Sequence, residues 1–258
     1  MVSYLRRFHN LTQLTMVPTR ALRAQLMEMG FENVQVVARG VDTKLFNPQR
    51  RSEALRSQWG AGPETLVMLV VGRLAAEKNL DVALQAHAAM QAHHPDVKLV
   101  FVGDGPLRES LQQRCPQAVF AGMRRHEELA GYYASADLFV FPSLTETFGN
   151  VTIEALASGL PVLAFDTAAA SDWVQSHTNG WLVPAGQEAA FVRVAVNLAQ
   201  TPSLLAQARE QARSRVAHLD WQQIALQVET LMLQAAGAVS SQETGRRLDL
   251  SQPSAPLM

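Results

Sequence analysis

From residue 66 onward, short apolar runs alternate with longer stretches that have helical periodicity. The apolar runs suit strands buried on both faces, and they lie at residues 66–71, 97–102, 118–120, 137–141, 160–165 and, with a weaker pattern, 180–183. The helical stretches fill the gaps, at about residues 79–93, 106–113, 126–134, 150–158, 187–200 and 220–236. This alternation predicts an α/β fold, a doubly wound parallel sheet with helices on both faces and right-handed crossovers.

The two ends of the chain do not repeat this pattern. Residues 14–19 and 34–37 predict two strands around one helix at residues 20–30, which Gly30 closes. Because two strands are not expected to be stable alone, we interpret this segment as the end of a domain whose beginning is absent. Residues 238–258 are polar and non-periodic, and we predict that they are disordered.

Length and composition limit the function classes. The 258 residues are 48% hydrophobic, enough for a full core, and 22 Lys and Arg residues balance 23 Asp and Glu residues, so no nucleic-acid partner is predicted. Cys115 is the single cysteine, which excludes a disulfide framework and favours a cytoplasmic location. No apolar run reaches about 18 residues, so a membrane span is not predicted, while peripheral contact with the inner membrane face stays an open expectation.

Strand order predicts where a ligand binds. In a doubly wound sheet of order 3-2-1-4-5-6, ligands bind beyond the carboxyl ends of the strands, where the first and fourth strands diverge. Counted from residue 66, the first strand runs into GRLAAEKN, the fourth into PSLTETFGN and the second into GDGP. Arg73 and Lys78 supply two cations there, and the amides of Phe148, Gly149 and Asn150 form a helix start that binds anions. This combination suits a diphosphate.

Two carboxylates, Glu146 and Glu154, flank the same helix start. Beside a diphosphate they would be repulsive unless each accepts hydrogen bonds from hydroxyls, which ribose and hexose groups offer. Glu154 lies one turn into the helix, where side chains lean back toward the N-terminus, so its carboxylate can approach the site. Glu146 precedes the turn and reaches a different part of the ligand. The set therefore predicts a nucleotide diphosphate sugar.

Each feature taken alone has another interpretation, because Arg73, Lys78 and Glu154 could be ordinary charged residues of a solvated surface. The GDGP stretch begins like a dinucleotide fingerprint, but Arg108 occupies the sixth position, which disfavours NAD. A P-loop sequence is absent. The histidines His87, His93 and His94 lack acidic partners at metal spacing, so we expect a surface cluster and predict neither a metal nor another cofactor.

Several stretches resemble retaining glycosyltransferases of family 4, which have the GT-B fold. VGRLAAEKNLD, VFVGDGP, FAGMRRHEELAGYYASADLFVFPSLTETFGNVTIEALASGLPV and NGWLVPAG resemble the C-terminal half of that family, a Rossmann-like domain. ARGVDTKLFNP resembles the link between its two Rossmann-like domains. The resemblance covers about residues 12–235, and it is greatest to bacterial GDP-mannose-dependent α-mannosyltransferases and to sulfoquinovosyl-diacylglycerol synthases.

The resemblance implies roles for individual residues. The E-x7-E motif of the family maps onto Glu146, which would contact hydroxyls of the donor sugar, and Glu154, which would contact the ribose. Arg73 and Lys78 would bind the diphosphate and stabilise the leaving nucleotide without a metal, so Arg73, Lys78 and Glu146 are the expected catalytic residues. The implied reaction is front-face transfer with retention, in which the donor phosphate helps to deprotonate the acceptor.

The remaining donor contacts are also implied by the resemblance. Loop residues Met123 and Arg124 would lie near the base, residues 103–106 would line the cleft, and the backbone of residues 148–151 would hold phosphate and sugar. The implied donor-binding residues are Gly72, Gly103, Asp104, Gly105, Met123, Arg124, Phe148, Gly149, Asn150, Val151 and Glu154. The donor would be GDP-mannose or a UDP-sugar and the acceptor a glycan or lipid, with base, sugar and acceptor left open.

Domain boundaries follow from the same comparison. We expect a remnant of the N-terminal acceptor domain at residues 1–40, an interdomain linker at 41–62 and a donor-binding domain at 63–219. A C-terminal crossover helix at residues 220–237 and a disordered tail at 238–258 follow. Our hypothesis is a truncated or mis-started form of a longer enzyme, with apolar surface exposed on residues 1–40 and 220–237. The alternatives are a non-enzymatic or split nucleotide-sugar-binding half that needs a partner domain, and an epimerase of the same fold, which the E-x7-E motif disfavours.

Overall fold

The computed structural model describes residues 2–146 and 149–237 and contains one large parallel sheet. Its six strands pair in the order β5-β4-β3-β6-β7-β8, and every pairing is parallel. The strands are β3 (Leu66–Val71), β4 (Val97–Val102), β5 (Val119–Phe120), β6 (Leu138–Phe141), β7 (Val162–Phe165) and β8 (Gly180–Val183). Counted from β3, this is the order 3-2-1-4-5-6, so the predicted doubly wound sheet is confirmed.

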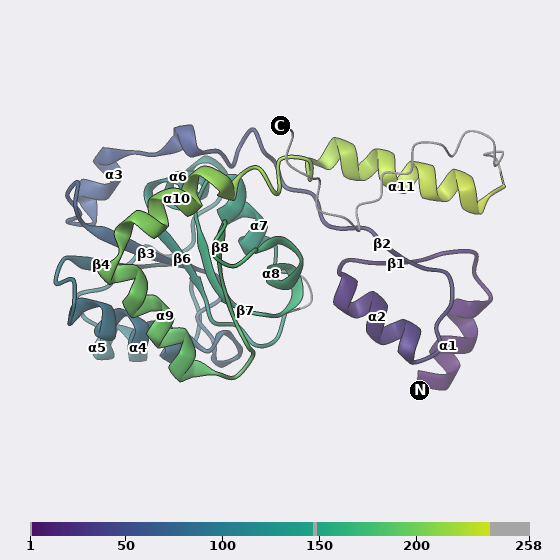
Figure 1. Ribbon diagram of the computed structural model, residues 1–258, viewed down its shortest axis with the longest axis horizontal. Helices are drawn as coiled ribbons and strands as arrows, with labels where there is room; N and C mark the ends of the chain where they lie inside the picture. The colour runs from purple at the N-terminus through teal and green to yellow at the C-terminus, as the bar shows by residue number, and fades with distance from the viewer. Residues whose placement is uncertain (1, 147–148, 238–258) are drawn as a thin grey trace.

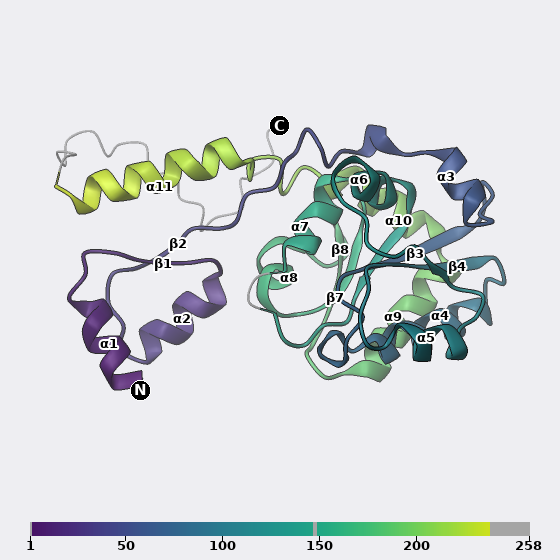
Figure 2. The ribbon, with the colours of Figure 1, turned by 180° about the vertical axis from the view of Figure 1, so that it is seen from behind.

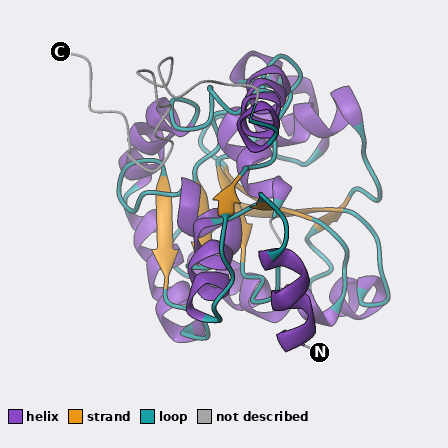
Figure 3. Cartoon of the chain, turned by 90° about the vertical axis from the view of Figure 1, so that its right-hand side faces the viewer, coloured by secondary structure: helices purple, strands orange, loops and turns teal. Residues whose placement is uncertain are grey.

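Helices cover both faces of this sheet, as Figure 1 shows and as the view from the side of α1 and α2 in Figure 3 also shows. They are α3 (Glu53–Gln58), α4 (Leu80–Gln91), α5 (Arg108–Arg114), α6 (His126–Ser135), α7 (Asn150–Ala157), α8 (Ala168–Trp173), α9 (Glu188–Gln200) and α10 (Pro202–Ala212). Strand β3 is buried along its whole length, because its alternate side chains enter two separate cores. Val67 and Leu69 pack with α6 and α7, whereas Leu66 and Met68 pack with α4 and α9. A strand buried on both faces must be apolar at every position, which explains the continuous run LVMLVV.

A smaller unit precedes the large sheet. It comprises α1 (Val2–Asn10), β1 (Thr15–Val17), α2 (Arg20–Glu28) and β2 (Val34–Val36), and β1 pairs with β2 in parallel. Its small core holds Val17, Phe31 and Val34, and the hydroxyl of Thr19 caps α2 by accepting from the Leu22 amide at 3.2 Å. Both strands and the helix between them lie where the sequence predicts.

The last described helix, α11 (Trp221–Ala235), lies beside this smaller unit, as Figures 1 and 2 show from opposite sides. The Asp220 carboxylate caps it by accepting from the amides of Gln222 and Gln223 at 2.9 and 3.1 Å. Gln227 donates to the carbonyl of Val36 on β2 at 3.2 Å. The expected exposed apolar side chains are present on α1 and α11, and they include Tyr4, Phe8, Trp221, Leu226 and Met232.

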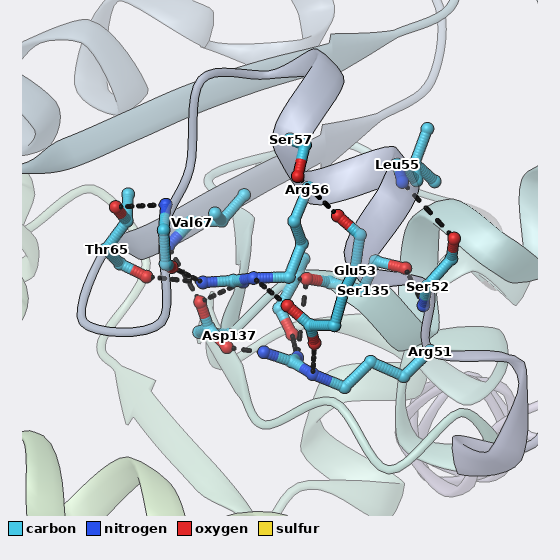
Figure 4. A network of polar contacts seen from close by, with 12 residues as sticks. Arg51, Ser52, Glu53, Leu55, Arg56, Ser57, Thr65, Val67, Ser135 and Asp137 are labelled. Atoms are coloured by element: carbon cyan, nitrogen blue, oxygen red, sulfur yellow. Dashed lines mark hydrogen bonds and ion pairs between the residues drawn. The ribbon is translucent and has the colours of Figure 1, made fainter.

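Residues 51–65 are held to the large sheet by a polar network around Arg56 of α3 (Figure 4). The Arg56 side chain is 1% exposed and donates to the carbonyls of Ser135, Gly62 and Thr65 at 2.9, 2.9 and 2.7 Å. It also pairs with the Asp137 carboxylate at 2.8 Å. Removing a buried guanidinium from water is costly unless its donors are paired, and four acceptors pair Nη1 and Nη2 here, while Nε makes a 3.6 Å ion-pair contact with Glu53 and no hydrogen bond.

The sequence pattern missed the helices α1, α3, α8 and α10. Helices α3 and α8 span six residues each, too few for a periodic pattern to register. In α10 the buried positions are Leu205, Ala208 and Ala212, so small alanines replace the large apolar residues that mark a helix face. The domain boundaries stay a prediction, and the expected disordered tail, residues 238–258, lies outside the described residues.

Within residues 2–146 and 149–237, none of the helices has the length and apolar character that crossing a bilayer requires.

Candidate functional site

A groove of about 430 Å³ lies at the carboxyl ends of β3 and β6. It is lined by Arg39, Val71, Gly72, Arg73, Lys78, Phe141, Glu146, Gly149, Asn150 and Val151. The loop after β3, the loop after β6 and the start of α7 therefore meet there, at the point where the strand order reverses. The groove brings together seven of the residues that the sequence singled out, namely Gly72, Arg73, Lys78, Glu146, Gly149, Asn150 and Val151.

Lys78 and Glu146 form an ion pair across the groove, with side chains 22% and 14% exposed. The Lys78 ammonium also lies 5.9 Å from the centroid of the Phe141 ring, a distance at which a cation is attracted to the ring face. The hydroxyl of Ser143 donates to Oε1 of Glu146 at 3.0 Å, the same oxygen that Lys78 contacts. Among the described residues, none donates to Oε2 of Glu146, the oxygen that we expect to accept from a ligand hydroxyl.

Arg73 is far more accessible than Lys78. Its side chain is 67% exposed, and its contact is with Glu77, 44% exposed, at 3.5 Å. An exposed pair at this separation contributes little free energy, so Arg73 can exchange Glu77 for an anionic ligand at small cost.

The start of α7 provides backbone donors. Gly149 is the N-cap residue with φ +88°, and no side chain caps the helix. The Thr152 amide donates to the Gly149 carbonyl at 3.0 Å, whereas the amides of Asn150 and Val151 bond no described residue. Unpaired amides at a helix start carry partial positive charge and bind anions. The positive φ favours glycine at residue 149.

Glu154 lies one turn further along α7 and does not line the groove. Its Oε2 accepts from the Tyr133 hydroxyl of α6 at 3.0 Å. Burial raises the pKa of Glu154, and the bond from Tyr133 partly offsets this rise. Burial and the neighbouring carboxylate together hold the pKa of Tyr133 well above its usual value. Sequence reasoning missed Tyr133, because nothing in the pattern distinguishes its hydroxyl from an ordinary buried tyrosine.

The GDGP loop packs beside the groove, and its glycines have a structural explanation. A Cβ at Gly103 would lie 1.9 Å from the Gly72 carbonyl oxygen, and one at Gly105 would lie 2.4 Å from that of Leu74. These two glycines thus allow the loops after β3 and β4 to touch. The Asp104 carboxylate accepts from the Gly105 amide and from Arg108, both at 2.8 Å.

The remaining predicted residues lie elsewhere. Met123 is 59% exposed, and Arg124 pairs with Glu128 at 3.8 Å and lies 5.9 Å from the Tyr132 ring centroid. Neither lines the groove, and their donor-binding role stays a prediction. Phe148 lies outside the described residues.

The histidine prediction needs a correction. His87 is not on the surface but 1% exposed, because it lies on the face of α4 that packs against the sheet. Its Nε2 lies 3.2 Å from the Val97 carbonyl oxygen and its Nδ1 3.7 Å from Sγ of Cys115, and burial lowers its pKa. Among the described residues, no group of three or more His, Cys, Asp or Glu side chains could hold a metal ion.

Sequence reasoning missed three lining residues, Val71, Phe141 and Arg39, of which Arg39 is the charged one. It lies in the stretch ARGVDTKLFNP, between β2 and the large sheet, 34 residues before Arg73 in the chain. The one feature of the sequence that could have indicated Arg39 is its position as a charged residue between the small residues Ala38 and Gly40.

Comparison with known proteins places the chain in a family. The family model described as "Glycosyl transferases group 1" matches residues 65–201. The chain is 43% identical over 185 residues to a GDP-mannose-dependent alpha-mannosyltransferase of Mycobacterium tuberculosis, covering 72% of this chain and 47% of that one. It is 35% identical over 186 residues to a sulfoquinovosyl transferase of Arabidopsis thaliana, covering 70% and 36%.

A solved structure shows the same fold. Sucrose-phosphate synthase from Thermosynechococcus elongatus matches with a TM-score of 0.78 and 28% identity, over 92% of this chain and 62% of that one. The chain spans about half the length, or less, of the curated relatives that it matches. The match of the family model includes β3 to β8 and the loops after β3 and β6 that line the groove, whereas Arg39 lies before it. The chain therefore belongs to the group 1 glycosyltransferases.

Proposed function

We propose that this chain carries the donor site of a retaining hexosyltransferase and that its groove binds a nucleotide diphosphate sugar. One observation carries the proposal. Two cations, Arg73 and Lys78, line the same groove as a helix start and a carboxylate, Glu146; the amides of Asn150 and Val151 and Oε2 of Glu146 bond no described residue. This arrangement complements a diphosphate that is joined to a hydroxyl-bearing sugar.

Each group has a role in the proposed reaction. Arg73 and Lys78 stabilise the charge that develops on the leaving nucleotide diphosphate, and the amides of Asn150 and Val151 add donors that need no reorganisation. Oε2 of Glu146 accepts from a hydroxyl of the donor sugar. Glu154 receives the ribose from one turn deeper in α7. The donor phosphate, left on the same face as the incoming acceptor, takes the acceptor proton, so configuration is retained.

Substrate identity rests on the relatives. GDP-mannose is the donor in the name of the Mycobacterium tuberculosis relative, and we propose it as the first donor to test, with UDP-sugars as the alternative. The acceptor is a glycan or a lipid, used on the cytoplasmic side, where a lipid acceptor implies peripheral membrane contact. We further propose that residues 63–219 form the donor domain, residues 1–40 a remnant of the acceptor domain, residues 41–62 the linker and residues 220–237 the crossover helix.

A second candidate is a donor-binding half that acts only with a partner domain. An apolar groove of about 660 Å³ along α11 favours it, because its lining includes Trp221, Ile224, Val228, Met232 and Leu233. Trp221 and Met232 of this groove are 54% and 59% exposed, and a continuous exposed apolar patch of this kind is typical of an interaction site.

Calorimetric titration of the chain with GDP, UDP and ADP tests the proposal. We expect saturable binding of one nucleotide, weakened about tenfold or more in Lys78→Ala, which removes a charged contact of the diphosphate, and in Glu154→Ala, which removes the proposed acceptor for the ribose hydroxyls. Lys44→Ala is the matched control, since Lys44 is exposed and does not line the groove. A folded chain that binds none of the three nucleotides contradicts the proposal.

A further inference from the structure

Arg39 is held in place from both sides by its backbone neighbours. Ala38 and Val41 are 6% and 3% exposed, and the Val41 amide donates to the Leu219 carbonyl at 2.8 Å. Gly40 lies so close to α11 that a Cβ there would come within 2.6 Å of the Trp221 ring. The backbone of this segment is therefore fixed, while the Arg39 side chain is exposed and lines the groove.

Arg39 differs from the other two cations of the groove in its lack of a described charged partner. Its guanidinium makes no hydrogen bond or ion pair with any described residue, whereas Lys78 pairs with Glu146 and Arg73 with Glu77. Of the charged residues that line the groove, Arg39, Arg73 and Lys78 are cations and Glu146 is the one described anion. The lining thus has an excess of two positive charges, which matches the about two negative charges of a nucleotide diphosphate sugar. Without Arg39 the excess would be one.

We propose that Arg39 is a third diphosphate-binding residue, which contacts the phosphate oxygens together with Arg73, Lys78 and the start of α7. This inference rests on the proposed function and deepens it. A guanidinium binds two phosphate oxygens at once, and its fixed backbone reduces the entropy lost on binding. Bound diphosphate thereby links residues 38–41 to the loop after β3, although they are far apart in the sequence.

The test uses the full chain with Arg39→Gln, Arg39→Lys, Arg73→Gln and the control Arg193→Gln. Arg193 is exposed on α9 and does not line the groove. We titrate each protein with inorganic pyrophosphate, with the nucleoside diphosphate that the wild type binds, and with the matching nucleoside. Arg39→Gln should weaken diphosphate and pyrophosphate binding about tenfold, equivalent to about 1.4 kcal/mol, and leave nucleoside binding unchanged. Arg39→Lys should recover part of the loss, because a point charge replaces a bidentate donor.

Three outcomes overturn the inference. If Arg39→Gln binds the diphosphate within about twofold of Arg193→Gln while Arg73→Gln binds it more weakly, Arg39 is no ligand and the proposed function stands. If Arg39→Gln weakens nucleoside binding as much as diphosphate binding, the residue does not act on phosphate. If the wild type binds neither diphosphate nor pyrophosphate, the proposed function fails together with the inference. Thermal unfolding of each variant shows that the protein compared is folded.

Discussion

Replacing Arg56 by methionine removes the central group of the network in Figure 4. The carbonyls of Ser135, Gly62 and Thr65 each lose a donor that lies at 2.7–2.9 Å. At about 1 kcal/mol for each lost bond, these contribute about 3 kcal/mol. The Asp137 carboxylate loses its 2.8 Å partner but keeps the amide of Val67 and contacts from Arg51 and Arg209 at 3.3 Å, so its share is about 1 kcal/mol. We therefore expect a loss of about 4 kcal/mol, within the range for breaking a buried pair.

Thermal unfolding followed by circular dichroism measures this loss. For a chain of this size, a loss of about 4 kcal/mol lowers the midpoint by about 10 °C. The matched control is Arg51→Met. Arg51 pairs with the same Asp137, but its own side chain is 32% exposed, so we expect this substitution to lower the free energy of unfolding by about 1 kcal/mol or less. If Arg56→Met lowers the midpoint no more than Arg51→Met, the buried network does not hold residues 51–65 to the sheet.

Two further predictions concern the candidate site. Burial raises the pKa of Glu154 above its usual value, so the stability of the wild type falls as pH rises through that raised pKa. Glu154→Gln should therefore gain stability relative to wild type as the pH of urea titrations is raised, and a pH-independent difference would contradict this. Gly103→Ala should lower the free energy of unfolding by more than about 3 kcal/mol. The new Cβ would lie 1.9 Å from the Gly72 carbonyl oxygen, and the backbone φ of +133° is unfavourable for alanine. Gly60→Ala, with φ +67° but no atom within 4 Å, should cost only about 1–2 kcal/mol in the same measurement; equal costs would show that the close approach does not matter.

The fold could be predicted from the sequence where burial leaves no choice of residue. Strands β3 and β4 begin and end where the predicted runs do, because strands covered by helices on both faces are mostly apolar, with Lys98 of β4 as the partly exposed exception. The helix α10 could not be found in this way, since its buried face uses alanines, which carry little hydrophobic signal. The same limit applies to His87, whose burial depends on which face of α4 meets the sheet.

The site could be predicted in part, because topology alone brings the loops after β3 and β6 together. That argument located Arg73, Lys78 and Glu146 in one groove. It could not find Arg39, which reaches the groove from a segment outside the sheet through packing against α11. Nor could it find the bond from Tyr133 to Glu154, because contacts between helices depend on side-chain packing that spacing does not encode.

The most direct test of the central proposal is to map the residues of the chain that a nucleotide diphosphate contacts. Amide chemical shifts of isotope-labelled protein, recorded while GDP and UDP are titrated in turn, report this residue by residue. We expect the largest shifts at the amides of Gly149, Asn150 and Val151 and in the loop that holds Arg73 and Lys78. Saturable shifts confined to other surfaces, such as the apolar groove along α11, or no shifts with either nucleotide, would contradict the assignment of this groove as a donor site.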